Sequence, residues 1–295
     1  MNLLENIQQT FRQGNTLIKL IYINAAVFVL FHLIVISLKL FNVPGDFLLQ
    51  YLAVPADVTQ VLYRFWTLLT YMFLHEGFFH LFFNLLCLYW FGKMFLMYFS
   101  EKQLVGLYLI GGFLAAAFYI IAYNIFPYYN SLIYSSLLMG ASGSVMAIIV
   151  ATAVKSPNSE MRLLLIGAVK LKYISVAVVL ISFFGITSKN GGGELAHLGG
   201  AFAGYLFAVS LNKGRDMTKW LNSLIDGLFS LFRPKKMKVS KKSAHYNKPQ
   251  MNDGDYNRNK AERMAEIDRI LDKIKSSGYE SLSAEEKRKL FEQGR

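Results

Sequence analysis

Gly192-Gly193-Glu194-Leu195-Ala196-His197-Leu198-Gly199-Gly200 leads into an apolar stretch that continues to residue 211. Gly200 and Gly204 are four residues apart, and Gly192 and Ala196 continue the same spacing toward the start of the stretch. Small residues at this interval let two membrane helices approach closely. A polar side chain inside such a stretch is disfavoured by lipid, which makes His197 a candidate for function.

A serine occupies a matching position in another apolar stretch. Ser142 stands in Gly140-Ala141-Ser142-Gly143, at the start of residues 140–154. Small residues then repeat every four positions, at Gly143, Ala147 and Ala151. Taken singly, the glycines indicate only helix packing. Taken together with Ser142 and His197, they predict a close helix pair, because a serine hydroxyl must come within about 2.6–3.2 Å of an imidazole to be activated. We therefore expect a Ser–His nucleophile pair inside a bilayer.

Six apolar stretches are candidates for membrane helices. They cover residues 17–40, 77–98, 104–123, 140–154, 173–187 and 194–211. Only 17% of the chain is charged, against about 25% in soluble domains. The sequence predicts an all-α membrane protein, a six-transmembrane-helix bundle with a small helical cytoplasmic tail. The last three stretches are short for the roughly 30 Å hydrocarbon core, so we expect them to be shielded or to face a water-filled cavity.

Positive charge is unevenly distributed between the loops. Basic residues cluster before the first stretch, after the second and after the fourth, at Arg12, Lys19, Lys93, Lys102, Lys155, Arg162, Lys170 and Lys172. Because cytoplasmic loops are enriched in Lys and Arg, both termini are expected in the cytoplasm, in a bacterial inner membrane. Stretches two, four and six then begin on the outer side, and their polar residues lie at one depth.

The second stretch carries two polar residues on one helical face. His80 and Asn84 are four residues apart, so both side chains point the same way. Beside a nucleophile, they and the backbone N–H of Ser142 would form an oxyanion hole. His75 lies off this face and is expected to hold the loop or to hydrogen-bond nearby backbone.

The remaining polar residues are interpreted more simply. The spacing His75-Glu76-x-x-x-His80 differs from the His-Glu-x-x-His of zinc proteases, so no metal site is expected. Glu76 and Glu194 are placed at interfacial depth, where we expect them to be solvated. His32, alone in the first stretch, is interpreted as a polar packing residue.

These motifs together resemble the rhomboid family of intramembrane serine proteases. The resemblance covers roughly residues 60–211 and includes, in order, Trp66-Thr67-Leu68-Leu69-Thr70-Tyr71-Met72-Phe73-Leu74-His75, the His75/His80/Asn84 set, Gly140-x-Ser142-Gly143 and Gly192-x-x-x-Ala196-His197-x-x-Gly200-x-x-x-Gly204. It implies cleavage of transmembrane proteins near the outer membrane boundary, without a cofactor. By residue-wise carry-over, Ser142 is the nucleophile, His197 is the general base and acid, and no Asp-type third member is expected. His80, Asn84 and the Ser142 backbone would form the oxyanion hole.

The chain departs from the family at one position. Many rhomboids place an aromatic ring four residues after the serine, against the catalytic imidazole, whereas this chain has Met146. Met can pack on a ring edge, so we expect activity to survive. The alternative is a non-catalytic rhomboid-like protein that binds membrane clients, although inactive relatives usually lack the serine or the histidine. A transporter is a third hypothesis, but no inverted repeat stands out.

The composition changes near residue 212. Residues 212–295 hold 20 of the 31 Lys/Arg and 12 of the 19 Asp/Glu. We therefore divide the chain into a cytoplasmic N-terminus (1–16), a six-helix rhomboid membrane domain (17–211), an interfacial helix with a polybasic linker (212–260) and a C-terminal helical hairpin (261–295).

The tail suggests contacts with lipid and with a protein partner. An apolar stripe is followed by basic residues: Trp220, Leu221, Leu224, Ile225, Leu228 and Phe229, then Arg233, Lys235, Lys236, Lys238, Lys241 and Lys242. This pattern predicts an interfacial helix anchored to anionic lipid, with a plain linker as the alternative. No motif supports nucleic-acid binding. In the hairpin, Gly278 breaks the first helix and Ser283-x-x-Glu286 is a capping box; a partner-docking role is a hypothesis.

Overall fold

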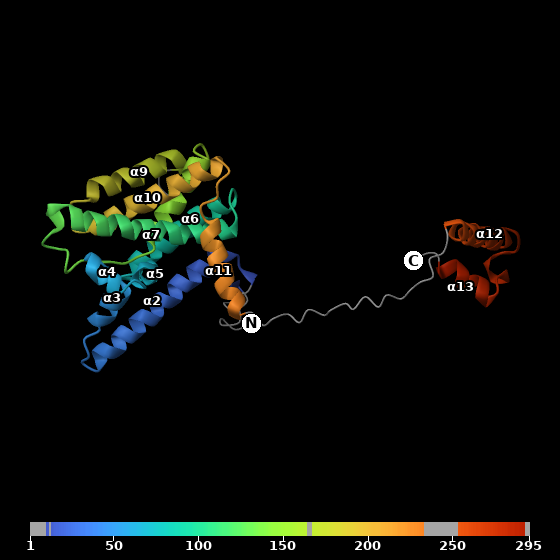
Figure 1. Ribbon diagram of the computed structural model, residues 1–295, viewed down its shortest axis with the longest axis horizontal. Helices are drawn as coiled ribbons and strands as arrows, with labels where there is room; N and C mark the ends of the chain where they lie inside the picture. The colour runs from blue at the N-terminus through green and yellow to red at the C-terminus, as the bar shows by residue number, and fades with distance from the viewer. Residues whose placement is uncertain (1–9, 12, 164–166, 233–252, 293–295) are drawn as a thin grey trace. The chain divides into compact units, whose positions relative to one another are not determined.

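The computed structural model describes residues 10–11, 13–163, 167–232 and 253–292. The chain divides into two compact units, Met1–Arg233 and Pro234–Arg295. The first unit is a helical bundle and the second a helical hairpin (Figure 1).

One short helix forms the centre of the first unit. α8 (Ser142–Lys155) packs against α6 (Phe78–Leu96), α7 (Glu101–Ile125), α9 (Leu171–Gly185) and α10 (Gly191–Asn212). Its residues from Gly143 to Ala153 are all buried. α2 (Thr16–Leu40) packs outside this group, against α6 and α7. Because neighbouring helices cover α8, its backbone is shielded from lipid even though the helix is short.

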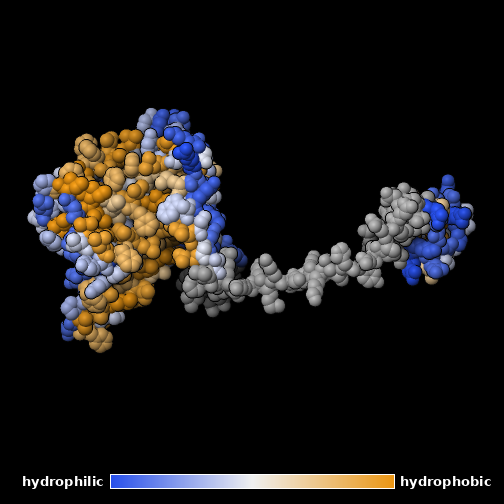
Figure 2. All heavy atoms as spheres, viewed as in Figure 1, coloured by the Kyte–Doolittle hydropathy of each residue, from blue (hydrophilic) through white to orange (hydrophobic). Residues whose placement is uncertain are grey.

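Among the described residues, four helices are long and apolar enough to cross a membrane: α2, α6, α7 and α10. α8 and α9 are apolar but shorter, with 14 and 15 residues. Each of the six apolar stretches found in the sequence overlaps one of these helices. Large apolar side chains such as Leu30, Phe79 and Phe184 are exposed on the outer faces. Hydrophilic residues gather at the two ends of the bundle (Figure 2), as expected of a protein embedded in lipid.

Local capping explains where the longest helices begin and end. At the start of α7, the Gln103 N–H donates to the Ser100 hydroxyl (3.2 Å) and the Ser100 N–H donates to Gln103 Oε1 (2.9 Å), which completes a capping box. Asn15 caps α2 by accepting from the Ile18 N–H at 3.1 Å. α7 ends at Ile125, two residues before Pro127, because proline cannot continue a helix.

Two short antiparallel ladders correct the all-α prediction. β1 (Val54–Pro55) pairs with β2 (Leu137–Leu138), and β3 (Glu160–Leu163) pairs with β4 (Gly167–Lys170). Strands of two residues are too short to show an alternating apolar pattern, so the sequence does not reveal the first ladder. The β1–β2 ladder joins the segment between α2 and α6 to the residues just before Ser142. That segment also contains α3 (Asp46–Leu52), α4 (Val58–Tyr63), α5 (Thr67–Thr70) and η1 (Tyr71–Phe73).

A further helix packs at the start of α7. α11 (Lys219–Phe232) is joined to it by a Lys102 Nζ–Asp226 Oδ2 ion pair of 2.6 Å, and Gln103 Nε2 donates to Asp216 Oδ2 at 2.9 Å. The exposed apolar side chains of α11 include Trp220, Leu224 and Leu228. The basic residues predicted to follow, at 233–242, lie outside the described residues, as do residues 1–9 of the predicted N-terminal segment.

The second unit contains the predicted hairpin. α12 (Asp253–Ser277) begins earlier than expected and ends at Gly278, whose φ of 77° lies in the left-handed region. η3 (Tyr279–Ser281) follows, then α13 (Ala284–Glu292). The Ser283 N–H donates to Glu286 Oε2 (2.7 Å) and the Glu286 N–H donates to Ser283 Oγ (3.3 Å), which confirms the capping box. Among the described residues of this unit, the apolar side chains of Ile270 and Leu282 are buried.

Two glycines of α10 let its backbone touch that of α8. A Cβ added at Gly200 would overlap the carbonyl oxygen of Gly143, and one added at Gly204 would overlap that of Ala147. Gly143 in turn leaves no room for a Cβ beside Ala115 of α7. The contact between Gly143 and Gly200 lies one residue after Ser142 on α8 and three residues after His197 on α10. It therefore sets the distance between α8 and α10 beside Ser142 and His197.

We predict that Gly200→Ala lowers the free energy of unfolding by about 1–3 kcal/mol, because the added methyl group pushes two backbones apart. The control is Gly227→Ala in α11, where a Cβ would meet nothing within 4 Å. Thermal unfolding of both variants in the same detergent measures the effect. Equal stability of the two would contradict the proposed backbone contact.

Candidate active site

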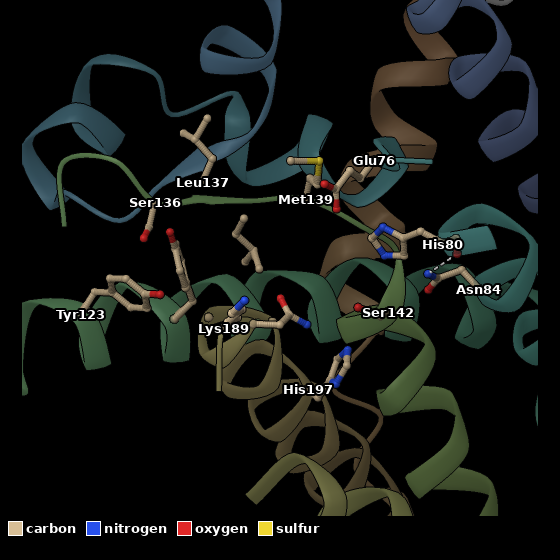
Figure 3. A pocket seen from close by; sticks show the side chains of 15 residues that line it. Glu76, His80, Asn84, Tyr123, Ser136, Leu137, Met139, Ser142, Lys189 and His197 are labelled. Atoms are coloured by element: carbon tan, nitrogen blue, oxygen red, sulfur yellow. Dashed lines mark hydrogen bonds between the residues drawn. The ribbon is translucent and has the colours of Figure 1, made fainter. Parts of the chain in front are cut away.

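A cavity of about 380 Å³ brings together the polar residues singled out in the sequence. His80 and Asn84 line it from α6, Ser142 from α8 and His197 from α10. The segment 136–139, which contains β2, forms another wall. The side chains of Ser142 and His197 point toward each other across the cavity, and His80 lies on its opposite side from His197 (Figure 3).

The turn before Ser142 depends on Gly140. This glycine has a φ of +124°, which L-residues rarely adopt, and its N–H donates to the Tyr71 carbonyl oxygen at 2.9 Å. A Cβ there would lie 2.9 Å from His80 Nε2 and 3.7 Å from Ser142 Oγ. We expected Gly140 to serve helix packing. It lies outside α8 instead, and it lets the His80 ring approach the backbone beside Ser142.

His197 is held from two directions at one ring nitrogen. Its Nδ1 lies 3.2 Å from Glu194 Oε2, one turn earlier on α10, and 3.2 Å from Ser182 Oγ on α9. No hydrogen bond of the described residues involves the other ring nitrogen, Nε2, and His197 lines the cavity.

The expectation that Glu194 is solvated is wrong. Only 17% of its side chain is exposed, and its carboxylate contacts the imidazole. The spacing of three residues between Glu194 and His197 is a signal that sequence reasoning could have used, since such residues are neighbours on a helix. Ser182 comes from a different helix, and no local spacing connects it to His197.

Asn84 is nearly buried and its amide is held by its own helix. The Asn84 Nδ2 donates to the His80 carbonyl oxygen at 2.8 Å. An amide nitrogen carries two hydrogens, so a second donor remains on the cavity side.

His75 lies behind His80. The rings of His75 and His80 are arranged edge to face, with their centroids 5.2 Å apart. His75 Nδ1 is 3.3 Å from the Phe73 carbonyl oxygen. The expected contact with nearby backbone is confirmed. His75 is only 1% exposed, and this burial, together with the neighbouring His80, lowers the pKa of His75 from 6.5 to about 4.

A second cavity, of about 280 Å³, adjoins the first and is mostly apolar. Ser142, Glu194 and His197 line it together with Met146, and α6 and α9 complete its walls with Phe83, Cys87, Val178 and Ile181. Met146 is buried at the position where an aromatic ring was expected from the family. In the part of the chain that the structure describes, no three His, Cys, Asp or Glu residues are grouped to hold a metal ion.

The long apolar helices and their exposed apolar faces define an integral, multi-pass membrane protein. A family model described as the Rhomboid domain matches residues 63–213, about half of the chain. The chain belongs to the rhomboid family, most of whose members are serine proteases. A second model, a family of unknown function, matches residues 252–294, which include α12 and α13. No curated protein matches the sequence.

The pKa of His75 predicts a pH dependence of stability. Above pH 6.5 the ring is neutral in the folded and the unfolded state. As the pH falls from 6.5 toward 4, the unfolded state takes up a proton that the folded state does not, so stability decreases through this window. We expect the melting temperature to fall less between pH 7 and pH 5 in His75→Gln than in the wild type. His32→Gln, on α2, controls for the loss of a histidine, and equal slopes in wild type and His75→Gln would contradict the assignment.

Proposed function

We propose that the protein is an intramembrane serine endopeptidase that cleaves transmembrane proteins with a Ser142–His197 dyad. The observation that carries the proposal is that these two side chains face each other in a polar cavity, on two helices whose backbones touch at Gly143 and Gly200. Membership of the rhomboid family supports the same chemistry.

The first chemical step is acyl transfer. His197 Nε2 takes the proton from Ser142 Oγ as the oxygen attacks a peptide carbonyl carbon. The same nitrogen then gives the proton to the leaving amine, which breaks the C–N bond. Water in the polar cavity hydrolyses the acyl-enzyme, again with His197 as base, and frees Ser142.

Three donors are available for the negative charge that develops on the carbonyl oxygen. They are the His80 ring, the second amide hydrogen of Asn84 and the backbone N–H of Ser142, which is the first residue of α8. A helix N-terminus presents free N–H groups and favours negative charge. Removal of one donor from such a hole typically costs 10²- to 10³-fold in kcat.

The proposed topology has six spans. α8 and α9 would be the fourth and fifth, and at 1.5 Å per residue they reach about 21–23 Å. α8 can be this short because other helices surround it. With both termini in the cytoplasm of a bacterial inner membrane, as the basic loops favour, Ser142 and His197 lie near the outer boundary, where substrates would be cut.

The four segments proposed from the sequence are a cytoplasmic N-terminus (1–16), the membrane domain (17–211), an interfacial helix with its polybasic linker (212–260) and the hairpin (261–295). Trp220, Leu224 and Leu228 of α11 are exposed on the first unit and would enter the headgroup region of anionic lipid. The hairpin remains a proposed docking site for a protein partner.

The proposal predicts that Ser142→Ala loses cleavage of transmembrane substrates, while Ser144→Ala keeps it. Ser144 is a matched control because it lies on the same helix and is 1% exposed, and its hydroxyl has no hydrogen-bond partner among the described residues. Purified proteins are incubated with a panel of transmembrane substrates in liposomes, and products are separated by electrophoresis. Cleavage by Ser142→Ala at the wild-type rate sinks the assignment. Substrate binding without cleavage by any protein, wild type included, favours the non-catalytic client-binding alternative.

A further inference from the structure

Glu194 and His197 form a contact that a Ser–His dyad does not require. The carboxylate oxygen and the ring nitrogen Nδ1 are 3.2 Å apart, and their side chains are 17% and 23% exposed. The imidazole therefore faces Ser142 with one edge and contacts a carboxylate with the other.

Residues of α9 surround the Glu194 side chain and hold its carboxylate in place. A Cβ added at Gly185 would come within 2.8 Å of Glu194 Cγ and 3.1 Å of Cδ, so glycine leaves the space that the side chain occupies. One turn earlier, Ser182 is 2% exposed and places its hydroxyl 3.2 Å from the same Nδ1. Apolar side chains of α9, Val178 and Ile181, line the cavity beside the pair. A charge in such surroundings interacts more strongly than one in water.

The geometry suits a specific task. When Nδ1–H donates to a carboxylate, the neutral imidazole is fixed in the tautomer whose Nε2 lone pair faces the nucleophile. After Ser142 loses its proton to Nε2, the ring is positively charged and the adjacent carboxylate stabilises it. The proton leaves Ser142 Oγ for Nε2 and then moves to the leaving amine, while Nδ1–H stays between His197 and Glu194.

We propose that Glu194 is a positioning residue that orients His197 and stabilises its charged form. The site then works as a Ser142–His197–Glu194 arrangement. Gly185 of α9 leaves space for the Glu194 side chain, and Ser182 of α9 contacts His197. This inference rests on the proposed function. It departs from the expectation, implied by the family resemblance, that the site has no Asp-type third member.

A simpler role competes with this one. Glu194 lies in the first turn of α10, where an acidic side chain stabilises the helix dipole. That role would change stability and leave turnover intact in the folded enzyme. Other polar groups near the imidazole, namely His80 from α6 and Glu76 and Lys189 on the polar cavity, do not contact Nδ1 among the hydrogen bonds of the described residues.

The test is steady-state cleavage of one transmembrane substrate in liposomes by the full chain. Glu194→Gln keeps the shape of the side chain and removes its charge. We expect kcat and kcat/KM to fall together by about 10-fold or more, with KM and the melting temperature close to wild type, because an interaction made in the transition state is lost. The control Glu160→Gln, on exposed β3, should change kcat less than about twofold.

A second variant keeps the Glu194 carboxylate and changes its position. Gly185→Ala should displace the flexible Glu194 side chain and lower kcat in the wild-type background. It should cause little further loss of kcat in Glu194→Gln, because the displaced group is then no longer a carboxylate. Gly185→Ala in the wild-type background remains informative if Glu194→Gln folds poorly.

The outcomes separate the two proposals. If Ser142→Ala is inactive but Glu194→Gln and Gly185→Ala turn over like the wild type, the positioning role is wrong and the dyad stands. If Glu194→Gln changes only the melting temperature, the helix-dipole role is the correct one. If Ser142→Ala cleaves as well as the wild type, the proposed function itself fails.

Discussion

The backbone contact between α8 and α10 is the constraint on which the rest of the site depends. Lipid is as apolar as the helices, so burial of apolar surface does not hold membrane helices together, and close packing must. Gly200 and Gly204 allow that packing by leaving no Cβ over the carbonyl oxygens of Gly143 and Ala147. Ser142 and His197 lie at one end of this contact. Their place on one cavity is therefore a consequence of how α8 and α10 pack.

Three polar side chains elsewhere in the bundle, Asn24, Tyr71 and Tyr108, pair their donors within the protein. The Tyr108 hydroxyl donates to the Met72 carbonyl oxygen at 3.0 Å and accepts from Asn24 Nδ2 at 3.2 Å. The Tyr71 hydroxyl donates to the Gly112 carbonyl oxygen at 2.6 Å. These bonds join α2 and α7 to the segment that precedes His75. The other amide hydrogen of Asn24 donates to the Leu20 carbonyl oxygen at 2.8 Å, so these three side chains keep no free donor. The cavity differs, because the hydrogen bonds of the described residues use neither the second amide hydrogen of Asn84 nor Nε2 of His197, and both residues line that cavity.

Much of this arrangement follows from residue spacing. The four-residue intervals of small side chains predict the α8–α10 contact, and His80 and Asn84 come together because they are one helical turn apart. Features built from distant segments could not be predicted in this way. The β1–β2 ladder joins residues 54–55 to 137–138, and the contact of Ser182 with His197 requires knowing which face of α9 points inward. The burial of Glu194 could not be predicted either, because it depends on the space that Gly185 of α9 leaves for the side chain.

The central claim is that Ser142 is a nucleophile activated by His197. It is tested most directly by reaction of the detergent-solubilised protein with a fluorophosphonate, followed by proteolysis and mass spectrometry to locate the covalent adduct. The account predicts one adduct, on Ser142, that is lost in His197→Ala and unchanged in Ser144→Ala. An adduct on another residue, or labelling of Ser142 at the same rate without His197, would contradict it.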